Sequence, residues 1–229
     1  FSAAEYQHGS ELWCTNGTLM GTFMVKDILA NGTTGGSNPY GFTEINGMFI
    51  FAATDTIGRE LWISDGTTNG THLLKDIYQG GGHANPADFT KLGSKVIFTA
   101  RDGSNHTELW VTDGTAGGTQ LLKDIRPGSS TSYPSYLTAY NGNVIFVADN
   151  GSNGTELWST DGTANGTQML VDIVPGPYSS DPVGFTEMGG KLYFYAKTSQ
   201  HGSELWVTDG TIAGTKMVKD IYPGYKSGM

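Results

Sequence analysis

The sequence predicts an all-β protein that is built from a tandem repeat, and three observations support this class. The triplet Glu-Leu-Trp begins at residues 11, 60, 108, 156 and 204, so the spacings are 49, 48, 48 and 48 residues. Charged residues make up only 15% of the chain, and 34 of its 229 residues are Gly, as short strands with tight turns require. Each period also holds four short segments that read as strands.

The four segments are clearest in the unit at 86–128. The first, at 89–92, is FTKL. The second, at 95–100 (KVIFTA), is apolar on both faces, which predicts a strand buried between two neighbouring sheets. The third, at 108–111, carries Leu and Trp on opposite faces, and the fourth, at 120–125, is QLLKDI. All are bounded by Gly, Asn, Asp or Pro, the residues of turns.

Four strands in about 48 residues is the size of a β-propeller blade. We therefore predict a single repeat domain over 1–229, made of five four-stranded antiparallel blades, either as a closed five-blade ring or as part of a larger propeller. Each repeated Trp is expected to be a core residue, because burying an indole is strongly stabilising. The repeat cores are expected at 11–28, 60–77, 108–125, 156–173 and 204–221.

The recurring words resemble those of the bacterial ELWxxDGT-repeat proteins, and the resemblance covers nearly the whole chain. It implies a secreted or surface-attached setting, extracellular or at the cell surface, and it implies no particular reaction. The first copy departs from the motif, because Asn16 stands where the other copies have Asp. Those Asp residues are Asp65, Asp113, Asp161 and Asp209.

The charge and hydropathy of the chain argue against some classes of partner. The formal net charge of −9 and the pI near 4.8 argue against nucleic acid, whose phosphates attract basic surfaces. No apolar run is long enough to span a bilayer. Cys14 fills a position held by Ile, Val or Ser in other copies, so we expect a small strand residue. Phe1 aligns inside a second strand, and residues 225–229 align before a first strand, so we expect further flanking sequence.

The recurrent acids are interpreted as structural. In the DGT turn, Asn16 can replace Asp as a hydrogen-bond acceptor, which counts against a metal site there. The Glu of ELW and the Asp of KDI are expected to bond turn or neighbouring-strand amides, with no cofactor. Calcium stays open as an alternative, since the loops offer oxygen ligands. The structural repeat residues are Glu11, Trp13, Asp27, Glu60, Trp62, Asp76, Glu108, Trp110, Asp124, Glu156, Trp158, Asp172, Glu204, Trp206 and Asp220.

No catalytic motif stands out: the chain lacks HExxH, G-x-S-x-G, P-loop and dinucleotide patterns. Variation is concentrated instead in loops that should emerge on one face, where binding residues are usual. We predict a non-enzymatic extracellular module that binds glycans or other surface proteins, for adhesion or surface assembly. The alternative is an enzyme, such as a glycan-acting hydrolase, with its site at a central channel. The candidate ligand-binding residues are Tyr133, Tyr136, Tyr178, Asp102 and Asp149.

Seven Asn-x-Ser/Thr sequons are candidate N-glycosylation sites in a secretory setting. The Gly-Thr pairs of the repeat create several of them without such a purpose. The seven are Asn16, Asn31, Asn69, Asn105, Asn150, Asn153 and Asn165.

Overall fold

The structure is a computed structural model that describes residues 1–30, 35–104, 106–128 and 130–224. These residues form five antiparallel sheets and contain no helix, as the sequence predicts. Accordingly, nothing in the described part offers a helix that could span a bilayer. Four of the sheets have four strands, and one has three.

Each four-stranded sheet contains a first, second, third and fourth strand in chain order. Sheet 1 (β1–β3) holds no first strand among the described residues, and sheets 2 to 5 follow as β4–β7, β8–β11, β12–β15 and β16–β19. The first strands are β4 (Tyr40–Ile45), β8 (Ala87–Leu92), β12 (Ser135–Tyr140) and β16 (Val183–Met188). The second strands are β1 (Ser2–Glu5), β5 (Met48–Asp55), β9 (Lys95–Arg101), β13 (Asn143–Asp149) and β17 (Lys191–Thr198).

The remaining strands complete each sheet on its other side. The third strands are β2 (Gly9–Cys14), β6 (Gly58–Ser64), β10 (Thr107–Thr112), β14 (Thr155–Thr160) and β18 (Gly202–Thr208). The fourth strands are β3 (Phe23–Lys26), β7 (His72–Lys75), β11 (Gln120–Lys123), β15 (Gln168–Val171) and β19 (Lys216–Lys219).

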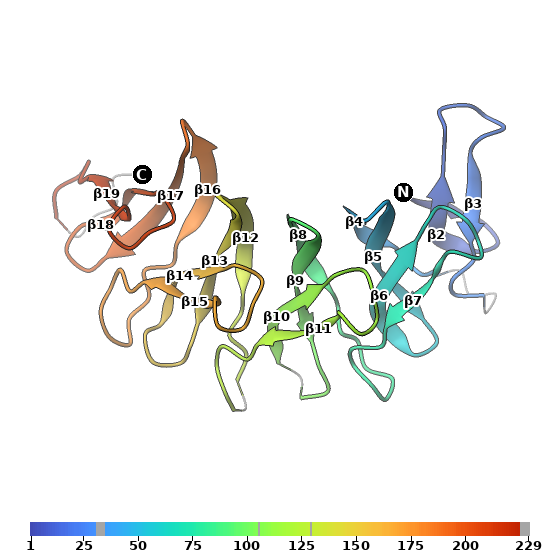
Figure 1. The fold of residues 1–229 in the computed structure, drawn as a ribbon, viewed down its shortest axis with the longest axis horizontal. Coiled ribbons are helices and arrows are strands. Elements are labelled where there is room, and N and C mark those ends of the chain that lie inside the picture. Colours follow the sequence, from blue (N-terminus) through green and yellow to red (C-terminus); the bar gives the residue numbers. More distant parts are fainter. Residues whose placement is uncertain (31–34, 105, 129, 225–229) are drawn as a thin grey trace. The chain divides into compact units, whose positions relative to one another are not determined.

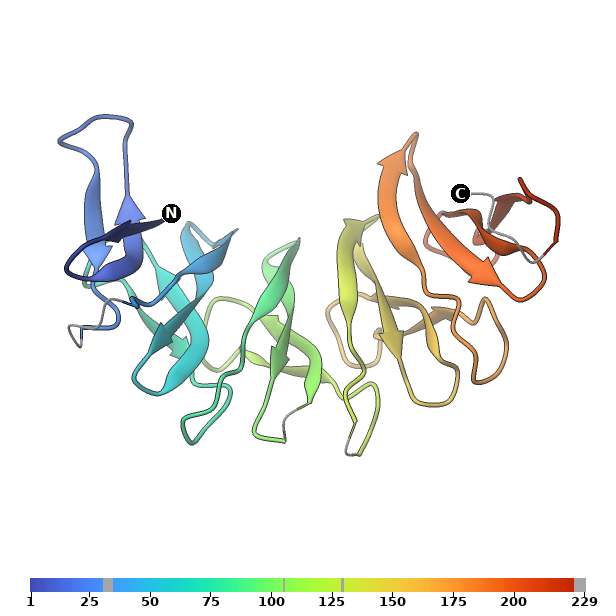
Figure 2. The same cartoon turned by 180° about the vertical axis from the view of Figure 1, so that it is seen from behind.

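Consecutive strands are neighbours throughout each sheet, so every sheet is an antiparallel meander (Figures 1 and 2). In sheet 4, for example, Phe146 of β13 lies opposite Trp158 of β14. A meander of this kind is the construction of a propeller blade. The predicted four-strand unit is therefore confirmed, and β1 lies where the alignment of Phe1 with the second strands puts it.

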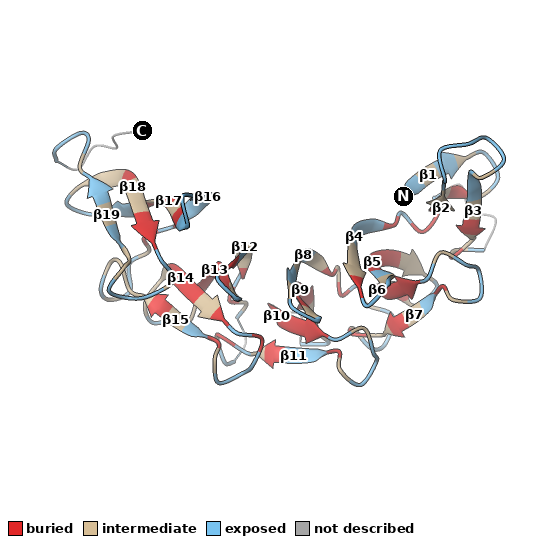
Figure 3. Ribbon diagram, turned by 45° about the horizontal axis from the view of Figure 1, so that its top comes forward, coloured by how far each residue is buried: buried red, intermediate tan, exposed pale blue. Residues whose placement is uncertain are grey.

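The core lies on the second and third strands. Phe51, Phe98, Phe146 and Phe194 occupy equivalent places on the second strands and are fully buried. Figure 3 shows buried residues on middle strands such as β9 and β10 and exposed residues on β16. The apolar character of both faces of the second strands thus marks strands that are covered on both sides.

The chain divides into two compact units. The first unit comprises Phe1–His106 and Trp110–Gln120, and the second comprises Thr107–Leu109 and Leu121–Met229. Sheets 1 and 2 belong to the first unit, and sheets 4 and 5 belong to the second.

One predicted boundary is wrong. The fourth strand of the unit at 86–128 ends at Lys123, whereas the sequence predicted a strand over 120–125. The backbone leaves the strand here because the Ile125 N–H bonds a side chain, Glu108, instead of a neighbouring strand. The expected position of residues 225–229 lies outside the described part of the chain.

Candidate functional site

The Glu of each ELW triplet fastens a loop to its sheet. In sheet 4, the buried Glu156 carboxylate accepts hydrogen bonds from the N–H groups of Ile173 and Ser180, both at 2.9 Å, and from the Ser180 hydroxyl at 2.6 Å. Ser180 lies in the loop that leads from the fourth strand of sheet 4 to the first strand of sheet 5. We call such a connection an inter-sheet loop. The bond to the Ile N–H recurs for Glu11 with Ile28, Glu60 with Ile77, Glu108 with Ile125 and Glu204 with Ile221.

Burial perturbs these carboxyl groups. Loss of solvent raises the pKa of Glu60 and Glu108, and it raises the pKa of Glu156 to about 7. The hydrogen bonds from Ser180 and Ile173 act in the opposite direction, because they favour the ionised form. Perturbed carboxyl groups of this kind can also mark active sites. Here they are fully engaged by the loop, which indicates a structural role.

The Asp of the KDI triplet does not repeat this arrangement, although the sequence analysis gave it the same role. One side-chain oxygen, Oδ1, is buried without a hydrogen-bond partner in four described copies, and Asp124 is exposed. The reason is position: each Asp follows the end of a fourth strand, beside the Glu, and the partner of Asp172 is the Asn153 side chain, at 2.8 Å, and not a backbone N–H. The negative charge of Asp172 accordingly contributes to the raised pKa of Glu156. The four copies are Asp27, Asp76, Asp172 and Asp220.

The DGT turns use an oxygen acceptor and not a charge. Oδ1 of Asp113 accepts bonds from the Thr115 N–H at 2.9 Å and from the Thr115 hydroxyl at 2.7 Å. In the first copy, Oδ1 of Asn16 accepts the same two bonds from Thr18, at 3.0 and 2.7 Å. The amide therefore reproduces the turn that the carboxylate makes elsewhere, as the sequence comparison predicts.

The inter-sheet loops lie beside the ends of the second strands. The N–H of Lys197, on β17, donates to the Ser180 carbonyl at 2.9 Å, and the N–H of Asp149, on β13, donates to the Ser132 carbonyl at 2.9 Å. Each of these inter-sheet loops therefore lies next to the turn that follows the second strand of the sheet to which the loop leads. This is the arrangement expected for the binding face.

Two of the candidate tyrosines have an unusual backbone. Tyr133 has φ 49° and Tyr136 has φ 56°, both in the left-handed region. For a bulky residue this conformation is a genuine outlier that costs free energy. The same two positions in the other sheets hold residues that tolerate it. Those at the position of Tyr133 are Asn38, Asn85 and Asp181, and those at the position of Tyr136 are Gly41, Asp88 and Gly184.

The left-handed backbone at the position of Tyr136 has a cause that the four-stranded sheets share. The first strand pairs with the second strand through a register shift, which lies between Ser135 and Thr138 in sheet 4. Tyr136 is inside that shift, which is a β-bulge, and bulges use residues with positive φ. Its side chain is half exposed, and its ring lies 6.3 Å from the ring of Phe185 on β16.

Tyr178 borders a groove of the second unit. Its side chain is 70% exposed and lines a groove of about 750 Å³ between the inter-sheet loop at 176–182 and the turn after β17. Lys197 and Asp181 form an ion pair on the wall, and the hydroxyls of Thr198 and Ser199 line it as well. These four residues are not among the ligand-binding residues that the sequence predicts. The shared emergence of the two loops was the signal that could have found them.

A smaller hollow of about 320 Å³ shares Thr198 and Ser199 with this groove and is also lined by His201 and Trp206. The His201 Nδ1 atom lies 3.0 Å from the Thr198 hydroxyl. Aromatic, hydroxyl and charged groups therefore line two hollows that share a wall. This mixture suits a polar organic ligand that offers hydroxyl groups.

The two candidate aspartates are occupied by local contacts. Asp149 forms an ion pair with Arg126 at 2.5 Å, and its Oδ1 accepts the Gly151 N–H at 2.6 Å. Asp102 belongs to the first unit, and its Oδ1 accepts the Ser104 N–H at 2.8 Å. Neither lines the Tyr178 groove. Their predicted role in ligand binding has no further support.

The described residues include one serine–histidine contact, in the turn after β9. The Ser104 hydroxyl lies 3.0 Å from His106 Nδ1 and also hydrogen-bonds the Asp102 carboxylate. Nucleophilic catalysis would need the third group to orient the histidine, as in a catalytic triad. Here the aspartate contacts the serine instead, so this turn is a local hydrogen-bond cluster.

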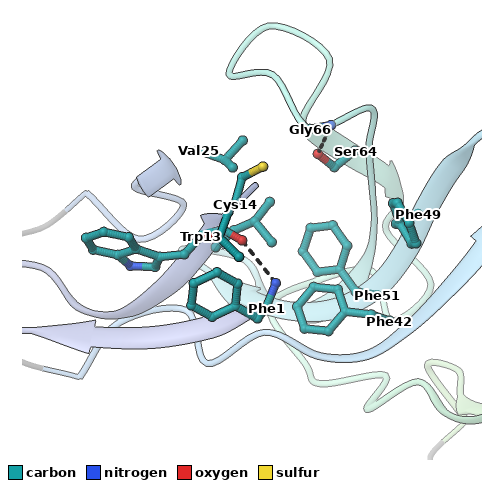
Figure 4. Close-up of a pocket in the computed structure, with 11 residues that line it drawn as sticks. Phe1, Trp13, Cys14, Val25, Phe42, Phe49, Phe51, Ser64 and Gly66 are labelled. Carbon is teal, nitrogen blue, oxygen red and sulfur yellow. Dashed lines mark hydrogen bonds between the residues drawn. The ribbon is translucent and has the colours of Figure 1, made fainter. Parts of the chain in front are cut away.

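The first unit contains an apolar cavity of about 250 Å³ between sheets 1 and 2 (Figure 4). The rings of Phe1, Phe42 and Phe51 face it, together with Cys14, and Phe42 stacks on Phe51 at 5.3 Å. The hydroxyls of Thr15 and Ser64 line it as well, and it has no charged side chain. Such a lining is mostly apolar, and it includes the free thiol of Cys14.

Among the sequons, Asn69 and Asn165 are exposed in DGT loops. Asn16 is exposed too, although its oxygen closes the turn, whereas the Nδ2 groups of Asn150 and Asn153 already donate hydrogen bonds. Asn31 and Asn105 lie outside the described residues. Within the described part, no group of three or more His, Cys, Asp or Glu residues could hold a metal ion.

No protein-family model and no curated protein sequence matches the chain. Solved structures do. A crystal structure of puromycin hydrolase matches with a TM-score of 0.52 and 17% identity over 89% of this chain and 32% of that protein. A mutant of puromycin hydrolase complexed with PGG gives 0.54 and 15%, over 86% and 30%. The acylaminoacyl peptidase of Pyrococcus horikoshii gives 0.49 and 13%, over 78% and 26%.

The chain thus spans about a third of the length of puromycin hydrolase. At this identity the likeness concerns the fold. We conclude that this chain has a β-propeller-like fold of meander sheets that is similar to part of puromycin hydrolase.

Proposed function

We propose that this chain is a non-enzymatic module that binds glycans through the loops of its second unit. The observation that carries the proposal is the left-handed backbone of Tyr133 and Tyr136. The chain itself uses Asn, Asp or Gly at the equivalent positions, so tyrosine there carries a backbone strain that the fold can avoid. Strain that a fold does not need is a mark of a functional residue.

The chemistry of the loops supports a glycan. Tyrosine supplies a large, rigid and amphipathic contact surface with few rotatable bonds, and Tyr133 and Tyr178 are both mostly exposed. The ion pair of Asp181 and Lys197, with nearby hydroxyls, supplies acceptors and donors that hydroxyl groups of a sugar can use.

The repeated motif suggests the architecture of the protein and where it acts. We infer that the five sheets are the blades of a β-propeller, as a ring of five or as part of a larger one, and that the chain is an ELWxxDGT-repeat protein. On this proposal it acts outside the cell or at its surface, with glycans or other surface proteins as partners. Similar loops on successive blades would raise the overall affinity through multivalency.

A glycan array with the purified chain tests the proposal. We expect binding that is lost in Tyr133→Asn, Tyr136→Gly and Tyr178→Ala and is retained in Tyr6→Asn. Tyr6 is a suitable control because it is a highly exposed tyrosine of the first unit. The first two changes insert residues that the chain already uses at these positions, so loss of binding would not reflect misfolding.

A hydrolase substrate panel run with the same variants addresses the alternative function. Turnover without glycan binding would favour an enzyme. Equal binding by the wild type and by all three loop variants would refute the assignment of the tyrosines.

A further inference from the structure

Each inter-sheet loop places one side chain beside the end of a second strand. A backbone hydrogen bond joins the loop to the strand end, as from the Lys197 N–H to the Ser180 carbonyl at 2.9 Å. The next residue of the loop precedes a proline and has a positive φ. The fold thus repeats one pair of neighbouring positions and fills it with different chemistry. The pairs are Asn38 with Thr54, Asn85 with Arg101, Tyr133 with Asp149, and Asp181 with Lys197.

In sheet 4 an arginine fills the space next to this pair. Arg126 lies in the inter-sheet loop that leads to sheet 4, and it forms an ion pair with Asp149 at 2.5 Å. Its side chain lies against the turn after β13, because a β-carbon placed on Gly151 would be 2.9 Å from Arg126 Nε. The loop therefore supplies the cation here, and the strand end supplies the anion.

Sheet 5 reverses this arrangement and leaves the space open. Counted along the repeat, Val174 takes the place of Arg126, and Ser199 takes the place of Gly151. The cation is now on the strand end, as Lys197, and its partner is Asp181 of the loop. Val174 and Ser199 both line the groove that Tyr178 borders. The groove therefore lies where the arginine side chain lies in sheet 4.

The groove has apolar and polar lining groups from different segments. The inter-sheet loop contributes the apolar side chain of Val174 and the ring of Tyr178, and the turn after β17 contributes the hydroxyls of Thr198 and Ser199. A sugar ring has the same two characters, since its C–H face packs on an aromatic ring and its hydroxyl groups donate and accept hydrogen bonds. The lining therefore matches one sugar unit of a glycan.

The charges of the groove are balanced. Lys197 Nζ donates to the Asp181 carboxylate, and the two side chains are 52% and 46% exposed, so a ligand can reach both. A ligand anion would meet an ammonium group that already has a partner, together with a carboxylate that repels it. Specificity often comes from such a repulsive group. The groove therefore favours a sugar that carries no charge.

We propose that this groove binds a neutral sugar unit and that Asp181 is the residue that excludes an anionic one. The inference rests on the proposed function, because it assigns the class of sugar that the loops of the second unit recognise. Tyr178 packs on the C–H face of the sugar, and Thr198 and Ser199 bond its hydroxyl groups. Asp181 keeps Lys197 in the ion pair, so uronic acids and sulfated sugars bind more weakly.

An array of matched glycans tests the exclusion, with pairs such as glucosides and glucuronides that differ in one charged group. We expect the wild type to prefer the neutral member of each pair. Asp181→Asn leaves Lys197 without its carboxylate partner, so it should bind the anionic member roughly fivefold more tightly, which is the effect of one exposed charge contact. High salt should abolish this gain. The variant keeps the fold, because Asn38 and Asn85 already occupy this position with a positive φ.

Asp209→Asn is the matched control for charge. It makes the same change in net charge outside the groove, and Asn16 already makes the equivalent turn. Its preference should equal that of the wild type.

The double variant Val174→Arg with Ser199→Gly tests the groove itself. It restores the two residues that lie together in sheet 4, so the added side chain should fill the space and abolish sugar binding. Sugar binding that survives in this variant overturns the inference alone. So does a wild type that binds both members of a pair equally, or an Asp181→Asn variant with an unchanged preference. A wild type that binds no sugar overturns the proposed function and this inference with it.

Discussion

The buried Glu156 should make the second unit less stable as the pH rises through the neutral range. Its pKa is about 7 in the folded chain, against an ordinary 4.5 for glutamate. Because each pKa unit corresponds to about 1.4 kcal/mol, the ionised carboxylate lowers the free energy of unfolding by about 3 kcal/mol. The Glu156→Gln substitution removes this charge and with it the part of the pH dependence that Glu156 contributes.

The sign follows from the proton count. Below pH 4.5 the carboxyl group is protonated in both the folded and the unfolded chain, so it contributes no pH dependence. Between 4.5 and about 7 the unfolded chain releases the proton while the folded chain keeps it, so stability falls as pH rises. Glu60 and Glu108 act in the same direction. Asp113 and Asp209 have lowered pKa values, so their contributions are lost only in more acidic solution.

Two measurements check this prediction. Carbon-13 NMR of the Glu156 carboxyl carbon gives its pKa directly. Urea denaturation at about pH 5 and about pH 8 gives the change in stability, which should be larger in the wild type than in Glu156→Gln. Glu44→Gln is the control, because Glu44 is more exposed and its pKa is lowered by its Lys91 partner. A Glu156 that titrates near 4.5, or equal pH slopes in all three proteins, would refute the reasoning.

Four further predictions have defined outcomes. Asp113→Asn should leave the melting temperature unchanged, as Asn16 already makes this turn, whereas Asp113→Ala should lower it. Asp124→Ala should leave thermal melting unchanged, since Asp124 is exposed, and so should added chelator, since the described residues include no group of three that could hold a metal ion; a marked fall reversed by calcium would contradict this. Tyr133→Asn should raise the free energy of unfolding by about 1 kcal/mol, measured in urea, because it relieves backbone strain. Thr167→Val should cost about 1 to 3 kcal/mol in the same assay, since the buried Thr167 hydroxyl bonds two partners.

The sheets were predictable because their signal is repeated. A 48-residue period with four apolar segments constrains strand number and order, and a segment such as 95–100 is apolar enough to identify a strand covered on both faces. The end of the fourth strand was not predictable in this way. Ile125 is apolar like Leu121 and Leu122 and so extends the strand signal, but its N–H turns to the Glu108 carboxylate, a contact between residues that are distant in sequence.

The two recurrent acids illustrate the same limit. Glu156 and Asp172 recur equally at every copy, so recurrence alone assigns them one role. Their environments differ, because Glu156 lies within a buried third strand and faces the loop, whereas Asp172 follows a strand end and meets Asn153 and the charge of the glutamate. Recurrence thus identifies positions that the fold requires. It does not identify which partner each side chain finds.

The tyrosines represent the opposite case, because they are identified as functional candidates by their difference from the equivalent residues in the other copies. Their place on variable loops was predictable from the sequence, but their backbone strain was not, since φ is a property of the folded backbone. The sequence nonetheless contained a sign of this strain. The residue before the proline of the inter-sheet loop is Asn38, Asn85 or Asp181 in three copies, and it is Tyr133 in the loop that leads to sheet 4. Local propensity and fold agree at three of these positions and conflict at one. Such a conflict is expected where function, and not stability, determines the residue.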